Sequence, residues 1–189
     1  ILLFSALGHE PPRYAHLPLV LGPDRKVLSK RRGAVAIGEY RRMGYLPEAL
    51  VNYIALLGWA YDGEQEFFSL DELAAKFDIG RVGRKAAAFD PDKLAWMNAQ
   101  WIKRLSVPER TDRVIPFLRE AGLVEDELPE SERSRLEEIV RVLDDRLKTL
   151  ADIVDQAGFF LADDVSYATI ALESVLAKPG ADELLAGLS

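Results

Sequence analysis

The sequence predicts a mainly α-helical protein in which a small α/β part precedes an all-helical part. Helix-capping signals and i, i+3, i+4 spacing of apolar residues recur after residue 33. Strand patterns are confined to two short runs, residues 15–21 and 86–89. Charge also divides the chain: residues 1–105 carry 15 Lys and Arg against 12 Asp and Glu, whereas residues 106–189 carry 9 against 19. This asymmetry indicates two modules with different roles.

The composition excludes several classes of protein. With 49% apolar and 29% charged residues among 189, the chain should fold as a soluble globular protein. It has no cysteine for disulfides or thiolate zinc sites, and two histidines are too few for a histidine-based metal cluster. No apolar run approaches the ~20 residues of a membrane helix. The chain begins without Met inside an apolar run, and we therefore expect a fragment of a longer protein.

The first part combines a short strand with a basic loop. AHLPLVL, residues 15–21, is predicted to be a buried strand, and Gly22-Pro23-Asp24 predicts the turn after it. The run RKVLSKRRG, residues 25–33, then supplies five cations in nine residues. A loop of this kind in an acidic chain indicates an anionic ligand.

Four helices are expected next, with short connections. The first covers residues 37–43 and ends at Gly44, and the second runs from Pro47 to Gly58. The third begins at the capping box of Ser69, and the fourth begins where Asp90 precedes a first-turn proline. Core positions are predicted on the second and fourth helices: Leu50, Tyr53, Ile54, Leu57, Leu94, Met97, Trp101 and Ile102.

The sequence beyond residue 106 is helical throughout. Three helices are predicted over residues 108–121, 132–145 and 147–160, because their apolar residues keep a spacing of three and four. Residues 166–176 and 181–188 are weaker helical candidates, separated by a Pro-Gly pair. This pattern is typical of a helical bundle.

Four segments resemble the glutamyl-tRNA synthetases, a family of class I aminoacyl-tRNA synthetases. The first, HLPLVLGPDRKVLSKRRG, is similar to the KMSKS loop of that family and contains the basic run. The others, in chain order, are GYLPEALVNYIALLGW, FDPDKLAWMNAQWI and RLKTLADIVDQAGFF. A short basic motif often occurs by chance, but four ordered segments over most of the chain make the resemblance specific.

The resemblance places the family motif on one stretch: Val27, Leu28, Ser29, Lys30 and Arg31. Its first position is usually lysine, and this chain has Val27 there, with Lys26 beside it as a supporting charge. The resemblance implies that Lys30 is the catalytic residue and that the loop binds ATP. Such a loop suits adenylate formation because the transition state at the α-phosphorus carries distributed negative charge, which positioned cations stabilise.

The resemblance also implies a domain order and an activity. Residues 1–22 would end a Rossmann-type catalytic domain, residues 23–106 would form an α/β stem-contact fold with the KMSKS loop, and residues 107–189 a truncated, helical anticodon-binding bundle. The parent enzyme would activate L-glutamate to glutamyl-adenylate with ATP and transfer it to tRNA(Glu). Mg²⁺ would accompany ATP as part of the substrate, and we expect no zinc in this fragment.

Much of that machinery should lie elsewhere in the parent. The HIGH motif of the family occurs nowhere in this sequence, and the glutamate pocket would lie mostly in the missing N-terminal part. We therefore expect the fragment alone to be inactive. The resemblance implies a cytoplasmic monomer with no membrane association. It leaves open whether the parent discriminates against tRNA(Gln).

A second basic cluster and the acidic half leave alternatives open. Arg81, Arg84 and Lys85 are candidate contacts to tRNA phosphates, although an ordinary charged loop would show the same composition. The net charge of the helical part, −10, is not typical of a nucleic-acid binder. The alternative function is a non-catalytic tRNA-binding or protein-docking module.

Overall fold

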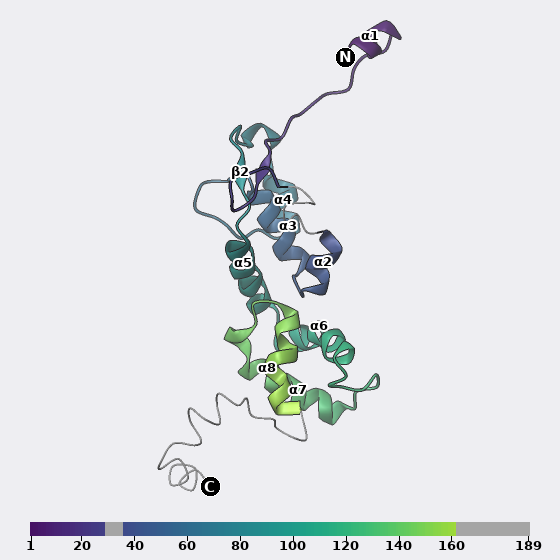
Figure 1. Cartoon of the computed structure of the whole chain (residues 1–189), viewed down its shortest axis with the longest axis vertical. Coiled ribbons are helices and arrows are strands. Elements are labelled where there is room, and N and C mark those ends of the chain that lie inside the picture. The colour runs from purple at the N-terminus through teal and green to yellow at the C-terminus, as the bar shows by residue number, and fades with distance from the viewer. Residues whose placement is uncertain (29–35, 162–189) are drawn as a thin grey trace.

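The protein is an elongated, mostly helical molecule (Figure 1). We describe it from a computed structural model, which covers residues 1–28 and 36–161. A short helix, α1 (Leu2–Ala6), lies at one end, apart from the rest. An extended segment leads from it to a small sheet and helices α2–α5, and helices α6–α8 form the opposite part. The predicted fold class, mainly α with a small α/β part, is confirmed.

The small sheet joins two segments that are far apart in the sequence. Strand β1 (Val20–Leu21) pairs in parallel with β2 (Ala87–Ala88). The prediction of a strand near residues 86–89 is confirmed. The prediction of a buried strand over residues 15–21 was wrong, because only two of those residues pair and Leu17 and Leu19 are 66% and 61% exposed. Within the described residues no packed layer covers this stretch, so its apolar run does not make a core strand.

The middle helices begin and end close to the expected signals. They are α2 (Ile37–Arg42), α3 (Pro47–Leu56), α4 (Leu70–Lys76), the 3₁₀ turn η2 (Ile79–Arg81) and α5 (Pro91–Arg104). Gly44 and Gly58 follow α2 and α3 with φ of +81° and +104°, a backbone region that glycine adopts without strain. The Ser69 hydroxyl accepts the Glu72 N–H as a capping box, and Asp90 caps α5. These local predictions are confirmed.

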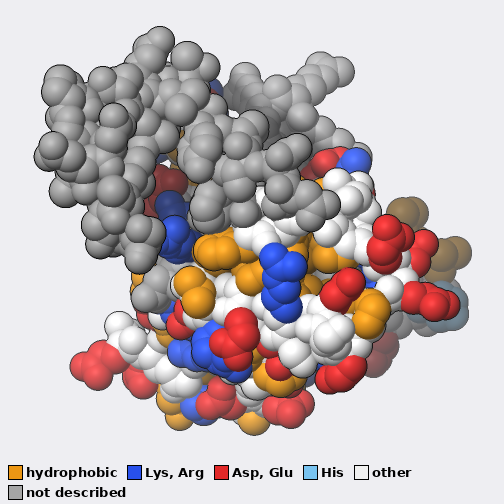
Figure 2. Space-filling model, turned by 90° about the horizontal axis from the view of Figure 1, so that it is seen from below, with side chains coloured by type: hydrophobic (Ala, Val, Ile, Leu, Met, Phe, Trp, Pro, Cys, Tyr) orange, Lys and Arg blue, Asp and Glu red, His pale blue; other side chains and the backbone are white. Residues whose placement is uncertain are grey.

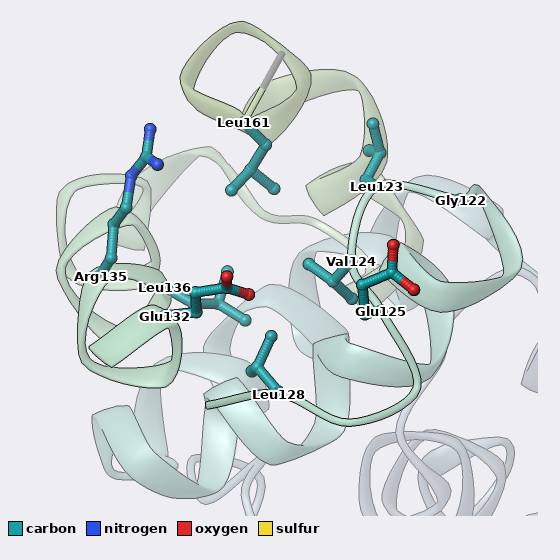
Figure 3. Close-up of a pocket in the computed structure, with 9 residues that line it drawn as sticks. All are labelled: Gly122, Leu123, Val124, Glu125, Leu128, Glu132, Arg135, Leu136 and Leu161. Carbon is teal, nitrogen blue, oxygen red and sulfur yellow. The ribbon is translucent and has the colours of Figure 1, made fainter. Parts of the chain in front are cut away.

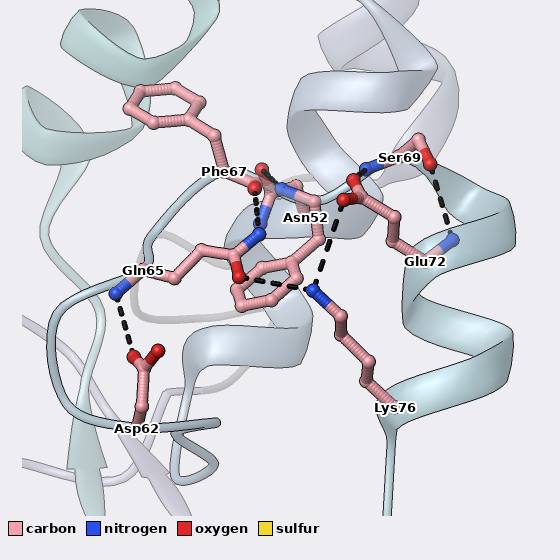
Figure 4. A network of polar contacts seen from close by, with 8 residues as sticks. Asn52, Asp62, Gln65, Phe67, Ser69, Glu72 and Lys76 are labelled. Carbon is pink, nitrogen blue, oxygen red and sulfur yellow. Dashed lines mark hydrogen bonds and ion pairs between the residues drawn. The ribbon is translucent and has the colours of Figure 1, made fainter.

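A polar network fixes the loop between α3 and α4 (Figure 4). The side-chain oxygen Oδ1 of the buried Asn52 accepts the backbone N–H of Phe68 and the indole N–H of Trp101, each at 3.1 Å. Lys76 donates to the Gln65 side chain at 3.1 Å, and its ammonium lies over aromatic rings of the same loop. These contacts tie the loop to side chains of α3, α4 and α5.

The helical unit consists of α6 (Val107–Glu120), α7 (Glu130–Val142), the 3₁₀ turns η3 (Asp144–Arg146) and η4 (Leu150–Asp152), and α8 (Ile153–Leu161). The predicted helix over 147–160 was wrong at its start. Thr149 and Asp152 form a capping box there, which begins a 3₁₀ turn before α8. The candidates at 166–176 and 181–188 lie outside the described residues.

One hydrophobic core crosses the predicted domain boundary at residue 106. Leu46, Ala49 and Ile102, from the sequence before that boundary, pack with residues of the helical unit. The fully buried members from the helical unit include Val114, Leu118, Val140, Leu143, Leu147 and Ile153. The two parts therefore share apolar side chains at their junction.

Polar contacts at this junction add directional constraints. Asn98 is fully buried on α5, where its side chain accepts the Leu46 N–H at 2.8 Å and donates to the Lys148 carbonyl at 2.7 Å. The Gly44 carbonyl accepts the Leu150 N–H at 2.9 Å. Because each buried backbone group needs a partner, these bonds fix how the α2–α3 turn meets η4.

A charged pair closes the same junction. Arg113 on α6 makes two hydrogen bonds to the Glu48 carboxylate on α3, at 2.9 and 3.3 Å. Partial burial opposes the charge of Glu48, but the hydrogen bonds and charge of Arg113 outweigh it and hold the pKa of that carboxyl below its ordinary value. The bidentate geometry favours one relative orientation of α3 and α6.

Candidate nucleotide and nucleic-acid interface

A tight hairpin carries the chain into the basic loop. The Gly22 N–H donates to the Lys26 carbonyl at 2.8 Å, and Arg25 takes a φ of +59° at the tip. Val27 then forms an antiparallel bridge with Leu21, and the Leu28 N–H donates to the Val20 carbonyl at 2.9 Å. The first two motif positions are therefore anchored to β1.

Ser29, Lys30 and Arg31 lie outside the described residues. The supporting residue Lys26 is exposed, and its backbone N–H donates to the Asp24 carboxylate at 3.0 Å. The hairpin thus sets the point at which the chain leaves the sheet, after Leu28.

Strand directions bring three segments to one end of the small sheet. Strands β1 and β2 run in the same direction, whereas the hairpin return at Val27–Leu28 runs the opposite way. The chain therefore leaves Leu28 toward the end of the sheet at which β1 and β2 begin. Arg84 and Lys85 precede β2 at that end, and His16 precedes β1. The topology places the exit of the chain at Leu28 and the cations Arg84 and Lys85 at the same end of the sheet.

The three cations of the second basic cluster differ in whether they contact other described residues. Arg81 donates to the Tyr61 carbonyl, and its guanidinium lies 5.6 Å from the centre of the Tyr61 ring. Arg84 and Lys85 are exposed and have no hydrogen-bond or ion-pair partner among the described residues. The structure thus separates Arg81, which contacts Tyr61 of the loop between α3 and α4, from the two cations that follow it.

A hollow of about 420 Å³ lies beside this cluster. One wall is the segment before β1, with His16 and Pro18, and the other is the loop from Ile79 to Arg84. His16 and Arg84 are far apart in the sequence, and the parallel pairing of β1 and β2 brings their segments together.

The far end of the helical unit has a different character. Figure 2 shows this end with Asp and Glu side chains spread around it and Lys and Arg between them. A hollow of about 330 Å³ opens there, with leucines such as Leu128 and Leu136 inside it (Figure 3). Glu125, Glu132 and Arg135 also line it, so its charge does not favour a phosphate.

The described residues contain neither a metal-binding cluster nor a membrane-spanning helix. No group of three or more His, Cys, Asp or Glu side chains in that part of the chain could hold a metal ion. None of its helices has both the length and the apolar character required to cross a bilayer.

Comparison with known families identifies the chain. The sequence model described as "tRNA synthetases class I (E and Q), catalytic domain" matches residues 1–96. The chain belongs to this family of class I tRNA synthetases. A second model, "Anticodon binding domain", matches residues 109–189. The order of the two matches agrees with the change from the sheet-containing part to the helical unit.

Two relatives of this class I synthetase chain are glutamate–tRNA ligases. It is 47% identical over 189 residues to a glutamate–tRNA ligase of a Synechococcus strain, covering 100% of this chain and 39% of the relative. It is 40% identical over 185 residues to the glutamate–tRNA ligase of Moorella thermoacetica, covering 98% of this chain and 38% of the relative. The chain thus spans about two fifths of the length of these relatives, in their C-terminal part.

A solved structure gives the same assignment. A glutamate tRNA ligase from Elizabethkingia meningosepticum, crystallised in complex with its amino acid, matches with a TM-score of 0.78. The sequence identity is 28%, and the match covers 99% of this chain and 39% of that one. The resemblance to this synthetase family that the four sequence segments indicate is therefore confirmed.

Proposed function

We propose that the chain is the ATP-loop and tRNA-binding part of a cytoplasmic, monomeric glutamate–tRNA ligase. The observation that carries the proposal is the identity of 40–47% to glutamate–tRNA ligases over nearly the whole chain. The parent enzyme activates L-glutamate with ATP to glutamyl-adenylate and transfers the glutamyl group to tRNA(Glu). Mg²⁺ enters with ATP as part of that substrate.

Lys30 is the catalytic residue in this proposal, within a KMSKS loop. Its ammonium stabilises the triphosphate and the departing pyrophosphate, because negative charge on the phosphate oxygens increases as the α-phosphorus is attacked. Ser29, Arg31 and Lys26 support it. The anchoring of Val27 and Leu28 on β1 favours this role, since it fixes the point at which the chain enters the proposed catalytic segment.

The proposed domain order assigns different tasks to the two ends. Residues 1–22 complete the catalytic domain, residues 23–106 form the stem-contact fold, and residues 107–189 bind the anticodon. The two unengaged cations Arg84 and Lys85 support RNA contact by the stem-contact fold, and Arg81 joins them as a candidate.

Two measurements test the proposal. ATP–pyrophosphate exchange by the complete ligase should fall to background when Lys30 is changed to Ala, whereas the 189-residue chain should show no exchange above its own Lys30→Ala variant. The chain should bind tRNA(Glu) more tightly than an unrelated tRNA. Wild-type exchange by the complete Lys30→Ala ligase would overturn the assignment of the catalytic residue.

The acidic helical unit favours one competing function, a protein-docking module without catalysis. A salt titration separates the two, because RNA binding through phosphates weakens steeply with salt, with a slope set by the number of phosphates neutralised. A packed apolar protein interface responds little to salt. Absence of tRNA binding at low salt would favour the docking function.

A further inference from the structure

A hollow of about 460 Å³ lies where the end of α2 and the turn after it meet α6 (Figure 1). Its volume falls within the roughly 300–1,000 Å³ of small-molecule sites, which occur preferentially where two domains meet. One wall comes from the sequence before the predicted boundary at residue 106, and the other from the helical unit. The hollow therefore has the size and the location of a ligand site.

Aromatic and proline side chains make much of the lining. Tyr45 and Pro47 supply them from the turn, and Pro116 and Phe117 from α6. The Tyr45 ring packs edge-on against Tyr40, with 5.4 Å between the ring centres, so its position is fixed from behind. An apolar group of a ligand would leave water on entering between these side chains, which favours binding.

The two walls are held together by contacts described above. Arg113 on α6 forms two hydrogen bonds with the Glu48 carboxylate on α3, at 2.9 and 3.3 Å. The Gly44 carbonyl accepts the N–H of Leu150, which also lines the hollow, at 2.9 Å. These contacts involve backbone groups and paired side chains only. The hollow is thus formed before a ligand enters.

Two charged side chains of opposite sign line the hollow from opposite walls. They are Arg41 on α2 and Glu120 at the end of α6. Both are exposed, and neither side chain has a hydrogen-bond or ion-pair partner among the described residues, so they do not pair with each other. The other cations of the lining, Arg42 and Arg113, already pair with carboxylates of α2 and α3. The described lining thus offers an unpaired cation and an unpaired anion to a ligand.

We infer that this hollow binds a small zwitterion with an apolar body, the chemical class of the apolar α-amino acids. Arg41 donates hydrogen bonds to the ligand carboxylate, and Glu120 accepts them from the ligand ammonium. Both side chains are long and rotatable, so they can reach the same charged end of one molecule from opposite walls. The apolar body lies against Tyr45 and Phe117. This inference does not depend on the proposed function, because it involves neither tRNA nor ATP.

The test is a chemical-shift titration of the nitrogen-15-labelled 189-residue chain with L-phenylalanine. Two analogues each remove one charge of the ligand: phenylpropionate lacks the ammonium, and phenylethylamine lacks the carboxylate. Two variants, Arg41→Gln and Glu120→Gln, each remove one charge of the protein. Both positions are exposed, so the variants should fold, and far-ultraviolet circular dichroism checks this.

The matched control variants are Arg146→Gln and Glu127→Gln. These residues are also exposed, their side chains also have no partner among the described residues, and neither lines the hollow. Both controls should bind all three ligands as the unaltered chain does.

We expect L-phenylalanine to bind more tightly than either analogue and to shift the amide signals of Tyr45 and Phe117. Arg41→Gln should weaken the binding of L-phenylalanine and phenylpropionate about tenfold and leave that of phenylethylamine unchanged, since only the first two carry a carboxylate. Glu120→Gln should weaken the binding of L-phenylalanine and phenylethylamine and leave that of phenylpropionate unchanged. The melting temperature of the unaltered chain should rise with L-phenylalanine concentration.

Two results would overturn the inference, and neither affects the proposed function. If L-phenylalanine, L-leucine and L-methionine at millimolar concentrations all leave the amide signals of the hollow unchanged, it is not a site for this class of ligand. If L-phenylalanine binds with equal affinity to the unaltered chain, Arg41→Gln and Glu120→Gln, the two charges do not hold the ligand.

Discussion

Replacement of Gly44 by Ala should destabilise the protein far more than the same change at Gly122. Both glycines follow a helix with positive φ, +81° and +70°. An added Cβ at Gly44 would lie 2.4 Å from the Ala151 nitrogen and 2.7 Å from the Leu150 nitrogen, whereas at Gly122 it would meet nothing within 4 Å. Gly122→Ala is therefore a control for the backbone conformation without the clash.

The expected magnitude follows from two terms. A left-handed conformation costs an alanine roughly 1–2 kcal/mol in either variant. The contact at Gly44 involves backbone atoms that cannot move independently, and overpacking of this kind costs about 1–3 kcal/mol more. Gly44→Ala should thus lose about 2–5 kcal/mol, or roughly 5–20 °C in melting temperature for a chain of this size.

Urea unfolding followed by circular dichroism measures both variants against the unaltered chain. The difference in unfolding free energy between Gly44→Ala and Gly122→Ala measures the cost of crowding the α2–α3 turn against η4. Equal losses in the two variants would refute the reasoning, because the junction would then have room for a methyl group at Gly44.

Three further predictions concern the same junction and the helix caps. Asn98→Ala should cost about 2–4 kcal/mol in urea unfolding, because the Leu46 N–H and the Lys148 carbonyl lose their buried partner; a loss below about 1 kcal/mol would contradict this. The pKa of Glu48 is lowered in the folded protein, so the stability that its ionised carboxylate contributes is present above pH 4.5 and is lost as the pH falls through the folded pKa. Glu48→Gln should therefore flatten the dependence of the unfolding free energy on pH below 4.5. An unchanged dependence would count against the Arg113 pair. Ser69→Ala should cost about 1 kcal/mol in thermal unfolding through loss of the capping box, and no change would show that the cap is dispensable.

Features that depend on a few neighbouring residues were predictable from the sequence. Capping at Ser69 and Asp90 and helix termination before Gly44 need only side chains and backbone groups within one turn. The face of a helix is a weaker prediction. Ile54 fits the apolar spacing of α3 but is 48% exposed, because no described element packs against that side.

Features that depend on distant partners could not be predicted. The expected strand over residues 15–21 has hydrophobic residues, yet its length is limited by the two residues that β2 supplies. Nothing local relates His16 to Arg84, since their proximity follows from strand pairing. The start of η4 could not be predicted because the helical spacing of apolar residues continues through Leu147 and Leu150. Thr149, which caps η4, lies between these two residues.

The hydrophobic core that crosses residue 106 has a consequence for exchanging parts between relatives. A chimera that joins residues 1–106 of this chain to the helical unit of another relative would bring together Leu46, Ala49 and Ile102 with foreign counterparts of Val114 and its neighbours. Mismatched volumes there leave cavities or overlaps, which cost stability on either side. A functional exchange would therefore transfer the α2–α3 turn and the end of α5 together with the helical unit. Although the two parts match separate family models, the residues that pack across their junction need to be exchanged together.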